Sequence, residues 1–458
     1  MQSPLRTATL LAAAMTTMTT VPAGAENLFS TTATNGGATV TSTGDNLLDL
    51  LEDAVETQGA FNSLNGTNFT AVTRYADVAN AIRINVNAAE TQATLEFPGT
   101  GFTRVFTGSD ADDLQDEIRE FIETDGGTAY AAFLADLNRR SLISVLDGNP
   151  FSTTALTNEH LFDSYGLGSG ASRFRVGRRA QYPSGQPPYA TPNDTLDAPP
   201  ADDTTLNGTP LSYSDDGSAG WSRDSVWLSL TPRFHTLDAA GFDGTAASFG
   251  FSSGYWFTDQ IAVAVGGNVH VNEYENTYTY HSSFNLALPI RAVDTGDAQG
   301  GFALELTPFL ISGLGGSIDA AAGGAFYGYG GAVNATLSLG VVQLKAAAQY
   351  VDFNDQDLEY DEFEFDTELD QSAVTLGGSI VIFLDGPHGH WWIDGGITHV
   401  EYLENAAVED WLRPEIGVGW RWGTDARLRL SYRDLDAEST DGRNIDASTL
   451  GMNLVFGF

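Results

Sequence analysis

Ala447 to Phe458 (ASTLGMNLVFGF), the last twelve residues, decide the fold. Side chains alternate along this stretch as they do in an extended strand, where successive residues point to opposite faces. One face is apolar and carries Leu450, Met452, Leu454, Phe456 and Phe458. The other carries Gly451, Asn453, Val455 and Gly457. The alternation predicts a terminal β-strand with one apolar face.

The same alternation recurs through the C-terminal half. From Val226 on, about twelve segments alternate apolar with small or polar residues, each near the roughly ten residues that a tilted membrane strand needs. Mostly short connections take turns with generally longer ones, and aromatic residues gather near the segment ends. The segments lie near 226–235, 246–257, 261–272, 277–291, 302–311, 327–339, 341–353, 373–384, 391–402, 412–422, 427–433 and 447–458. An even number of strands fits a closed barrel.

Residues 223–458 therefore resemble the Gram-negative outer-membrane β-barrel proteins. The resemblance implies an all-β, antiparallel transmembrane barrel of about twelve strands in contact with outer-membrane lipid. It also implies that Phe456 and Phe458 form part of the assembly signal recognised by the barrel-assembly machinery. A soluble β-sandwich would alternate too, but the terminal Phe, the rhythm of turns and loops and the N-terminal signal together favour the barrel.

The N-terminus carries the features of a secretory signal peptide over residues 1–25. Arg6 supplies the positive charge, residues 8–15 the apolar core, and Ala23 to Ala25 the small-residue cleavage site, so the mature chain is expected to begin at Glu26. No later stretch approaches eighteen continuous apolar residues, which argues against helical membrane spans. We therefore expect export to the outer membrane.

Composition excludes several classes of function. The chain has 60 acidic against 21 basic residues and no cysteine. A strongly acidic surface repels phosphate, so no nucleic-acid partner is expected. Without cysteine there is no disulfide scaffold, thiolate metal site or cysteine nucleophile. We predict no cofactor and no bound metal.

The N-terminal half predicts a small α+β domain over residues 26–166, located in the periplasm, in the pore or at the cell surface. Helices are expected near 46–58, after Ser109 and near 128–146, and strands near 81–88, 91–97 and 102–107. His160 is interpreted as a surface or capping residue. Residues 167–222 are rich in Pro, Gly and Asp and predict an extended linker.

Basic residues in the barrel half fall on the inward parity of their strands. Two acidic residues share that parity, so the lumen is expected to be net positive, and arginines lining a water-filled pore favour anions. The alternative is that Arg and Glu pair across strands and fill a narrow barrel. The predicted pore-lining residues are Arg233, Arg291, Glu305, Lys345, Arg413, Glu415, Arg421, Arg427, Arg429 and Arg433.

Other candidate sites are weaker. The acidic loop 352–370 could bind Ca²⁺ through carboxylates, but it lacks a calcium-loop pattern and is interpreted as a solvated surface loop. Residues 250–254 match G-x-S-x-G inside an alternating strand, where that motif has no chemical meaning. His235, His270 and His281 have inward parity, yet no nucleophile or orienting acid accompanies them. No catalytic residue is predicted.

Two functions remain, from different classes. The first is a porin-like channel that passes small anionic solutes along its luminal arginines. The second is an autotransporter-type protein whose barrel delivers residues 26–166 to the cell surface as an adhesin or binding domain. The Pro-rich stretch before the first strand departs from that family, which typically places a helix in the pore there. A surface hydrolase is less favoured, and the protein is not expected to be an enzyme.

Overall fold

The computed structural model describes residues 29–35, 37–44, 66–75, 78–121, 149–167 and 226–457. Scattered positions between 129 and 141 are described as well, and the last range has gaps at 240–241, 259, 275–276, 296–299, 318–321, 357, 361–362, 366–368, 387–389, 405, 423–425 and 441. The signal peptide, the helix near 46–58, the linker 167–222 apart from Leu167, and Phe458 lie outside the described residues. Most of the helix near 128–146 does too.

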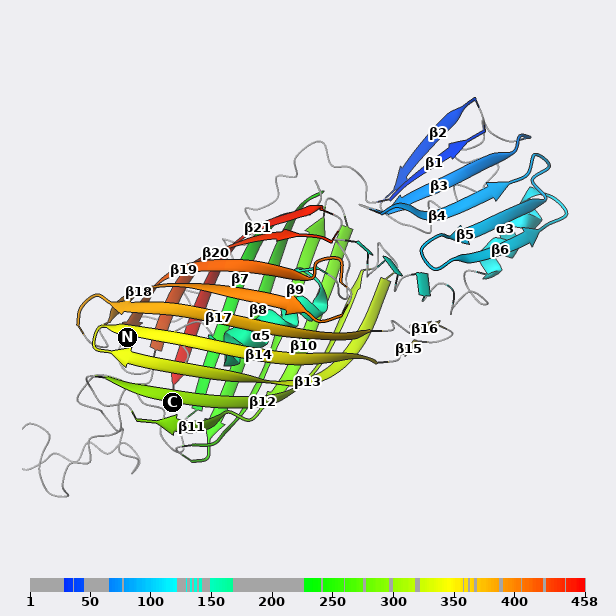
Figure 1. Ribbon diagram of the computed structural model, residues 1–458. Helices are drawn as coiled ribbons and strands as arrows, with labels where there is room; N and C mark the ends of the chain where they lie inside the picture. Colours follow the sequence, from blue (N-terminus) through cyan, green and yellow to red (C-terminus); the bar gives the residue numbers. More distant parts are fainter. Residues whose placement is uncertain are drawn as a thin grey trace, which may run out of the picture.

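Twelve antiparallel strands form a closed barrel in the C-terminal half (Figure 1). They are β7 (Val226–Ala239), β8 (Phe242–Trp256), β9 (Ala262–Tyr274), β10 (Thr277–Ala287), β12 (Gly300–Ser317), β13 (Ala322–Leu339), β14 (Val342–Gln356), β17 (Asp370–Phe383), β18 (Trp391–Tyr402), β19 (Asp410–Trp422), β20 (Ala426–Glu438) and β21 (Asn444–Gly457). The short β11 (Ile290–Asp294) follows β10 and pairs with β12.

Two pairings close the sheet into a ring. The C-terminal strand β21 pairs with β7, which joins the two ends of the barrel sequence. Strand β10 pairs with β12, which completes the circle. The predicted closed twelve-stranded barrel is confirmed, and closure leaves no unpaired strand edge.

The outside of the barrel is apolar. Leucine, isoleucine and valine side chains point outward and are exposed, among them Leu310, Ile380, Ile397, Ile416 and Leu450. Aromatic side chains flank this band, with Trp391, Trp420 and Trp422 near one end and Tyr278, Tyr280, Tyr327, Tyr329 and Tyr432 nearer the other. An apolar belt between two aromatic girdles is the surface of a barrel embedded in a bilayer.

The barrel has two distinguishable ends. At the near end β7 begins at Val226 and β21 ends at Gly457, and the connection between β13 and β14 is a tight turn at Gly340 with a positive φ of 61°. At the far end the connections include 402–410 and 356–370, and the latter contains the hairpin of β15 (Leu358–Tyr360) and β16 (Phe363–Phe365).

The N-terminal part contains a six-stranded antiparallel sheet and one helix. The strands are β1 (Phe29–Thr34), β2 (Thr39–Gly44), β3 (Phe69–Tyr75), β4 (Val78–Val86), β5 (Gln92–Phe97) and β6 (Phe102–Thr107), in the spatial order β2-β1-β3-β4-β5-β6. Helix α3 (Ala111–Glu120) packs Leu114, Ile118 and the adjoining Phe121 into the core of the sheet. The predicted strands near 81–107 are confirmed, whereas β1, β2 and β3 were not predicted. The helix cap is Asp110 rather than Ser109.

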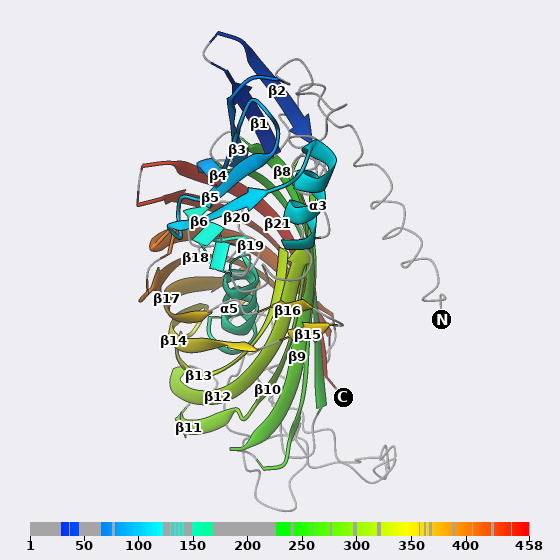
Figure 2. The ribbon, with the colours of Figure 1, turned by 90° about the vertical axis from the view of Figure 1, so that its right-hand side faces the viewer.

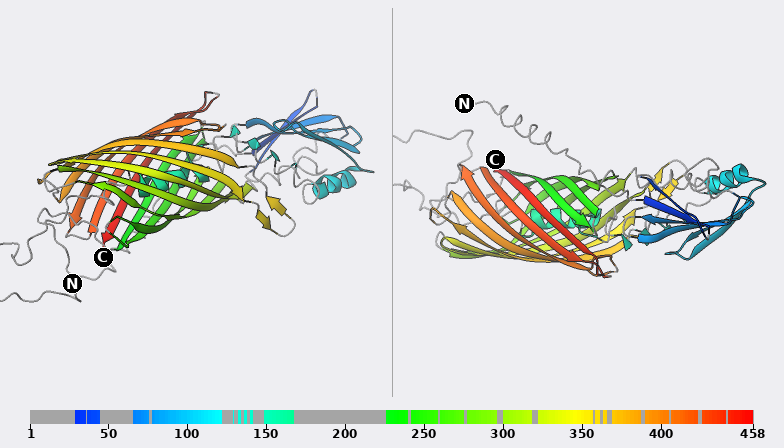
Figure 3. Two further views of the ribbon diagram at one scale, coloured as in Figure 1. Left: turned by 60° about the horizontal axis from the view of Figure 1, so that its bottom comes forward. Right: turned by 90° about the horizontal axis from the view of Figure 1, so that it is seen from above.

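A second helix, α5 (Thr153–Tyr165), lies inside the barrel (Figure 2). Ten of its thirteen residues are buried, and they come from all sides of the helix. The sheet lies beyond the far end of the barrel, away from the C-terminus (Figure 3). Among the described residues, no helix is long and apolar enough to cross a membrane.

Candidate functional site

The lumen of the barrel is polar, and α5 occupies it. Hydrogen bonds or ion pairs link α5 and its flanking residues to nine of the twelve strands, namely β7, β9, β10, β13, β14, β17, β18, β19 and β20. Ser152 caps the helix by accepting from the Ala155 N–H, as an N-cap serine does. A short helix of this polarity is stable here because the barrel wall supplies the hydrogen-bond partners that water would otherwise supply.

Two carboxylates on α5, Glu159 and Asp163, are four residues apart and therefore share one face of the helix. Three arginines of the barrel wall converge on them from β7, β19 and β20. Arg233 Nη1 lies 2.9 Å and Arg433 Nη1 2.6 Å from Glu159 Oε1, and Arg413 Nη1 lies 2.6 Å from Glu159 Oε2.

Asp163 completes this cluster. Arg433 donates to both of its oxygens, at 2.8 Å and 2.9 Å, in the bidentate geometry that makes arginine–carboxylate pairs strong. Arg233 also donates to Asp163. The five side chains, Arg233, Arg413, Arg433, Glu159 and Asp163, form what we call the luminal ion cluster. Its side chains are between 4% and 12% exposed, so water screens these charges little.

Wall residues extend this cluster. Glu415 on β19 lies 3.0 Å from Arg433 Nε and accepts from Arg429 Nη1 at 2.5 Å. Arg429 on β20 also donates to Asp394 on β18. These ion pairs connect neighbouring strands of the barrel wall to one another. The luminal ion cluster connects the wall to α5.

The charges around Glu159 favour its carboxylate form. Arg233, Arg413 and Arg433 each lie within 3 Å of its oxygens, and an opposite charge at that distance stabilises the ionised acid. His160, the next residue, is buried against the barrel wall.

Polar contacts fix the direction in which α5 runs. At its N-terminus, Thr154 contacts Gln371 at 3.2 Å and the Tyr402 hydroxyl at 3.3 Å, and both partners belong to the far end. At its C-terminus, Tyr165 donates to Asn285 at 2.7 Å, two residues before β10 ends. Asn334, on the near-end half of β13, donates to the Gly166 carbonyl at 2.9 Å. The chain therefore enters α5 from the far end and leaves it toward the near end.

Further contacts anchor α5 around its circumference. Asn158 donates to Thr375 at 2.8 Å and accepts from Gln349 at 2.7 Å. Thr153 contacts His281 Nδ1 at 2.5 Å. These pairs join residues more than 120 positions apart in the sequence, so they form only when the barrel closes around the helix.

Glycines in the wall make room for the helix. A Cβ atom on Gly250 would lie 2.9 Å from His160 Nδ1, and one on Gly377 would lie 3.0 Å from the Phe162 ring. A Cβ on Gly315 would overlap the Thr153 hydroxyl. At these three places the backbone of the wall approaches α5 more closely than any larger residue permits.

Three histidines of the wall form a ladder beside the N-terminal half of α5. The rings of His235 and His270 are 5.2 Å apart, and those of His270 and His281 are 5.8 Å apart. His235 contacts Thr449 through Nδ1, and His281 contacts Asn272 through Nε2. Within the described residues, no group of three or more His, Asp or Glu side chains is placed to hold a metal ion.

The structure places the predicted luminal residues as follows. Arg233, Arg413 and Arg433 meet α5, and Arg429 and Glu415 support them. Arg421 and Arg427 face each other on β19 and β20 and are buried. Glu305 and Lys345 are buried on β12 and β14, and the Arg291 guanidinium lies 4.5 Å from the centre of the Trp256 ring. Phe456 lies on β21.

Sequence reasoning missed Glu159, Asp163 and Asp394. The interpretation of His160 as a surface or capping residue was wrong, because that side chain is 5% exposed and lies against the barrel wall. The signal that could have found the helix is the i, i+4 pair of carboxylates in a segment with no basic residue, near a wall rich in inward arginines. The acidic segment 352–370, interpreted as a solvated surface loop, contains the β15–β16 hairpin, which was not predicted.

No family model matches the chain, and no curated protein matches it. Solved structures do match its barrel half. The apolar outer belt and the closed ring decide the fold class. The C-terminal half is a transmembrane β-barrel.

The matching structures include translocators and channels. The translocator domain of the autotransporter NalP from Neisseria meningitidis is 10% identical, with a TM-score of 0.33 over 52% of this chain and 90% of that chain. An outer-membrane channel from Pseudomonas putida F1 is 10% identical, with a TM-score of 0.37 over 52% and 97%. The transport unit of the autotransporter AIDA-I from Escherichia coli is 11% identical, with a TM-score of 0.33 over 50% and 89%. At these values the matches do not separate the two roles.

Proposed function

We propose that this protein is an autotransporter-type outer-membrane protein, whose barrel holds its own N-terminal sheet on the outside of the cell. One observation carries the proposal, namely that α5 threads the barrel from the far end to the near end. The sheet precedes α5 in the chain, and strand β7 begins at the near end after it. The polypeptide thus passes through its own barrel.

The longest connection and the chain ends support one orientation in the membrane. Outer-membrane barrels have short turns on the periplasmic side and longer loops outside. The near end has the tight turn at Gly340 and both ends of the barrel sequence, and the far end has the longest connection, 356–370, together with the short connections 239–242 and 274–277. The near end is then periplasmic and the far end external, where the sheet lies.

A contact outside the lumen supports this placement of the preceding chain. Arg443, in the far-end connection between β20 and β21, donates to the Arg140 carbonyl at 2.9 Å. Arg140, which precedes α5 in the chain, is therefore held at the far-end mouth. Because the helix is fixed by a buried ion cluster rather than by surface contacts alone, it would act as the anchor of the exposed domain.

Protease shaving of intact cells tests the proposal. Trypsin should release peptides around Arg74, Arg83 and Arg104 from intact cells, while barrel peptides stay with the membrane. Release of those N-terminal peptides only after the outer membrane is disrupted would overturn the proposal and place the sheet in the periplasm.

A second candidate, the anion channel, draws support from the excess of inward arginines. With α5 in place, Arg233, Arg413 and Arg433 are engaged by carboxylates, so the wall would present its positive charge to solutes only when α5 leaves the lumen. In that state the lumen would select anions over cations. Bilayer recordings of the barrel with and without α5 held in place distinguish the two roles.

A further inference from the structure

The sheet outside the barrel carries a row of hydroxyl and amide side chains on its exposed face. Strand register places Thr34 on β1 opposite Thr70 on β3, Thr70 opposite Asn85 on β4, and Asn85 opposite Thr94 on β5. Adjacent strands are about 4.8 Å apart, so the row places a polar group at that interval across four strands. The two central members are bonded to each other, since Thr70 donates to Asn85 at 2.7 Å.

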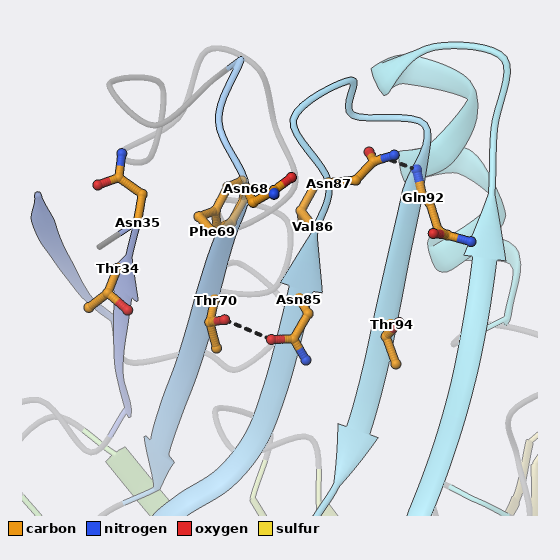
Figure 4. Close-up of a pocket in the computed structure, with 10 residues that line it drawn as sticks. All are labelled: Thr34, Asn35, Asn68, Phe69, Thr70, Asn85, Val86, Asn87, Gln92 and Thr94. Carbon is orange, nitrogen blue, oxygen red and sulfur yellow. Dashed lines mark hydrogen bonds between the residues drawn. The ribbon is translucent and has the colours of Figure 1, made fainter. Parts of the chain in front are cut away.

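An open depression of about 500 Å³ surrounds this row (Figure 4). Asn35, Asn68, Asn87 and Gln92 stand at its rim, and Phe69 and Val86 are the two apolar lining residues. None of the ten lining residues is charged, although the whole chain carries 60 acidic and 21 basic residues. The depression is thus a neutral, amide-rich and hydroxyl-rich surface on an acidic protein.

Part of this polar lining is already engaged in folding. Asn87 Oδ1 accepts from the backbone N–H groups of Thr91 and Gln92, and Asn68 Oδ1 accepts from the Ala88 N–H. These bonds fix the turns at the rim and orient the amides.

Other groups are uncommitted. Within the part of the chain that the structure describes, the side chains of Thr34, Gln92 and Thr94 make no hydrogen bond. Gln92 and Thr34 are exposed, and Thr94 is half-buried. These three side chains, together with Asn68 Nδ2, are available to a ligand.

We propose that this depression is a binding site for a neutral carbohydrate chain. Each sugar hydroxyl both donates and accepts a hydrogen bond, and so do the amide and hydroxyl side chains of the lining. An anionic ligand would find no cation in the lining and would be repelled by the acidic protein. A protein partner would be expected to anchor on exposed aromatic or arginine side chains, which the lining lacks.

Sugar binding by the sheet is a function in addition to the proposed display of the sheet by the barrel. The depression belongs to the folded sheet and binds sugar in purified protein regardless of how the domain is oriented in a membrane. Its use in adhesion to a glycan surface rests on the proposed function. Sugar binding by the purified protein tests the site, and exposure of the sheet on intact cells tests the proposed function. Either result can be negative without the other.

The test uses the full chain in lipid nanodiscs and three immobilised neutral probes: dextran, mannan and β-1,4-linked oligomers of N-acetylglucosamine. Polygalacturonate serves as the acidic comparison. The triple variant Thr34→Ala, Gln92→Ala, Thr94→Ala removes three side chains that make no internal hydrogen bond, so it folds. Thr103→Ala, on the same face but outside the depression, is the matched control.

We expect at least one neutral probe to bind, the triple variant to bind it at least about tenfold more weakly, and Thr103→Ala to bind it unchanged. Three results would each overturn the assignment: no binding to any neutral probe, equal binding by the triple variant, or tighter binding of polygalacturonate than of the neutral probes.

Discussion

The luminal ion cluster predicts what happens when its acidic half is neutralised. In the variant Glu159→Gln, Asp163→Asn, three buried arginines lose their carboxylate partners on α5. Breaking a buried ion pair by removing one partner costs about 3–5 kcal/mol, because the remaining charge is left uncompensated. The two carboxylates share Arg233 and Arg433, so their effects do not add, and this range applies to the double variant.

This loss of free energy shifts the equilibrium from the barrel with α5 in its lumen toward the barrel from which α5 has left. Since every 1.4 kcal/mol is tenfold, the vacated state should become about a hundredfold to several thousandfold more populated. Water would enter and hydrate the arginines. In planar bilayers the variant should therefore open far more often than the wild type, and its open state should prefer chloride to potassium.

The matched control is Glu117→Gln, an exposed carboxylate on α3. It changes the charge of a helix outside the barrel and should leave conductance unchanged. If the double variant folds into bilayers and conducts no more than the wild type, the ion cluster does not hold α5 in the lumen.

Three further substitutions test the fit of the helix, the lipid-facing surface and the packing of the barrel wall. Gly315→Leu should raise conductance, because its side chain occupies the space of Thr153; bilayer recording checks this. Ile416→Arg, at an outward position 65% exposed, should lower the free energy of folding into vesicles by about 2–4 kcal/mol, measured by urea titration. Trp392→Ala should lower it by about 3–5 kcal/mol in the same assay, because Trp392 is 1% exposed and packs in the wall.

The barrel was predictable because its strands separate two different environments. Lipid lies outside the wall and a polar lumen inside, so residue polarity alternates along each strand with a period of two. In β21, Leu450, Met452 and Leu454 face the lipid, whereas Gly451 and Asn453 face the lumen. The alternation therefore predicted the strands and their inward basic residues without any knowledge of their partners.

Strands of the N-terminal sheet were harder to predict. In β1, Thr31 and Ala33 are buried whereas Thr32 and Thr34 face outward, so threonine stands on both faces and the apolar alternation is weak. Strand β2 has the same character and lies at the sheet edge. Local pattern does not mark strands whose two faces have similar polarity.

Helix α5 escaped prediction for a different reason. It is surrounded by the barrel wall on every side and makes both polar and apolar contacts, such as Phe162 with Ala347, so it has no single apolar stripe and shows no helical period in hydrophobicity. Its partners are remote as well, since Glu159 and Arg433 are 274 residues apart. The inward arginines could be predicted, but the carboxylates that engage them could not, because only closure of the barrel brings them together.

If the chain threads its own barrel as proposed, the sheet lies outside the cell. The chain has no cysteine, so single-cysteine variants can be labelled without background. Thr103→Cys reports on the sheet and Gln260→Cys on a near-end turn, and both positions are exposed. A membrane-impermeant maleimide applied to intact cells should label Thr103→Cys and not Gln260→Cys, and both should react once the outer membrane is disrupted. Labelling of Gln260→Cys but not of Thr103→Cys on intact cells would contradict the account.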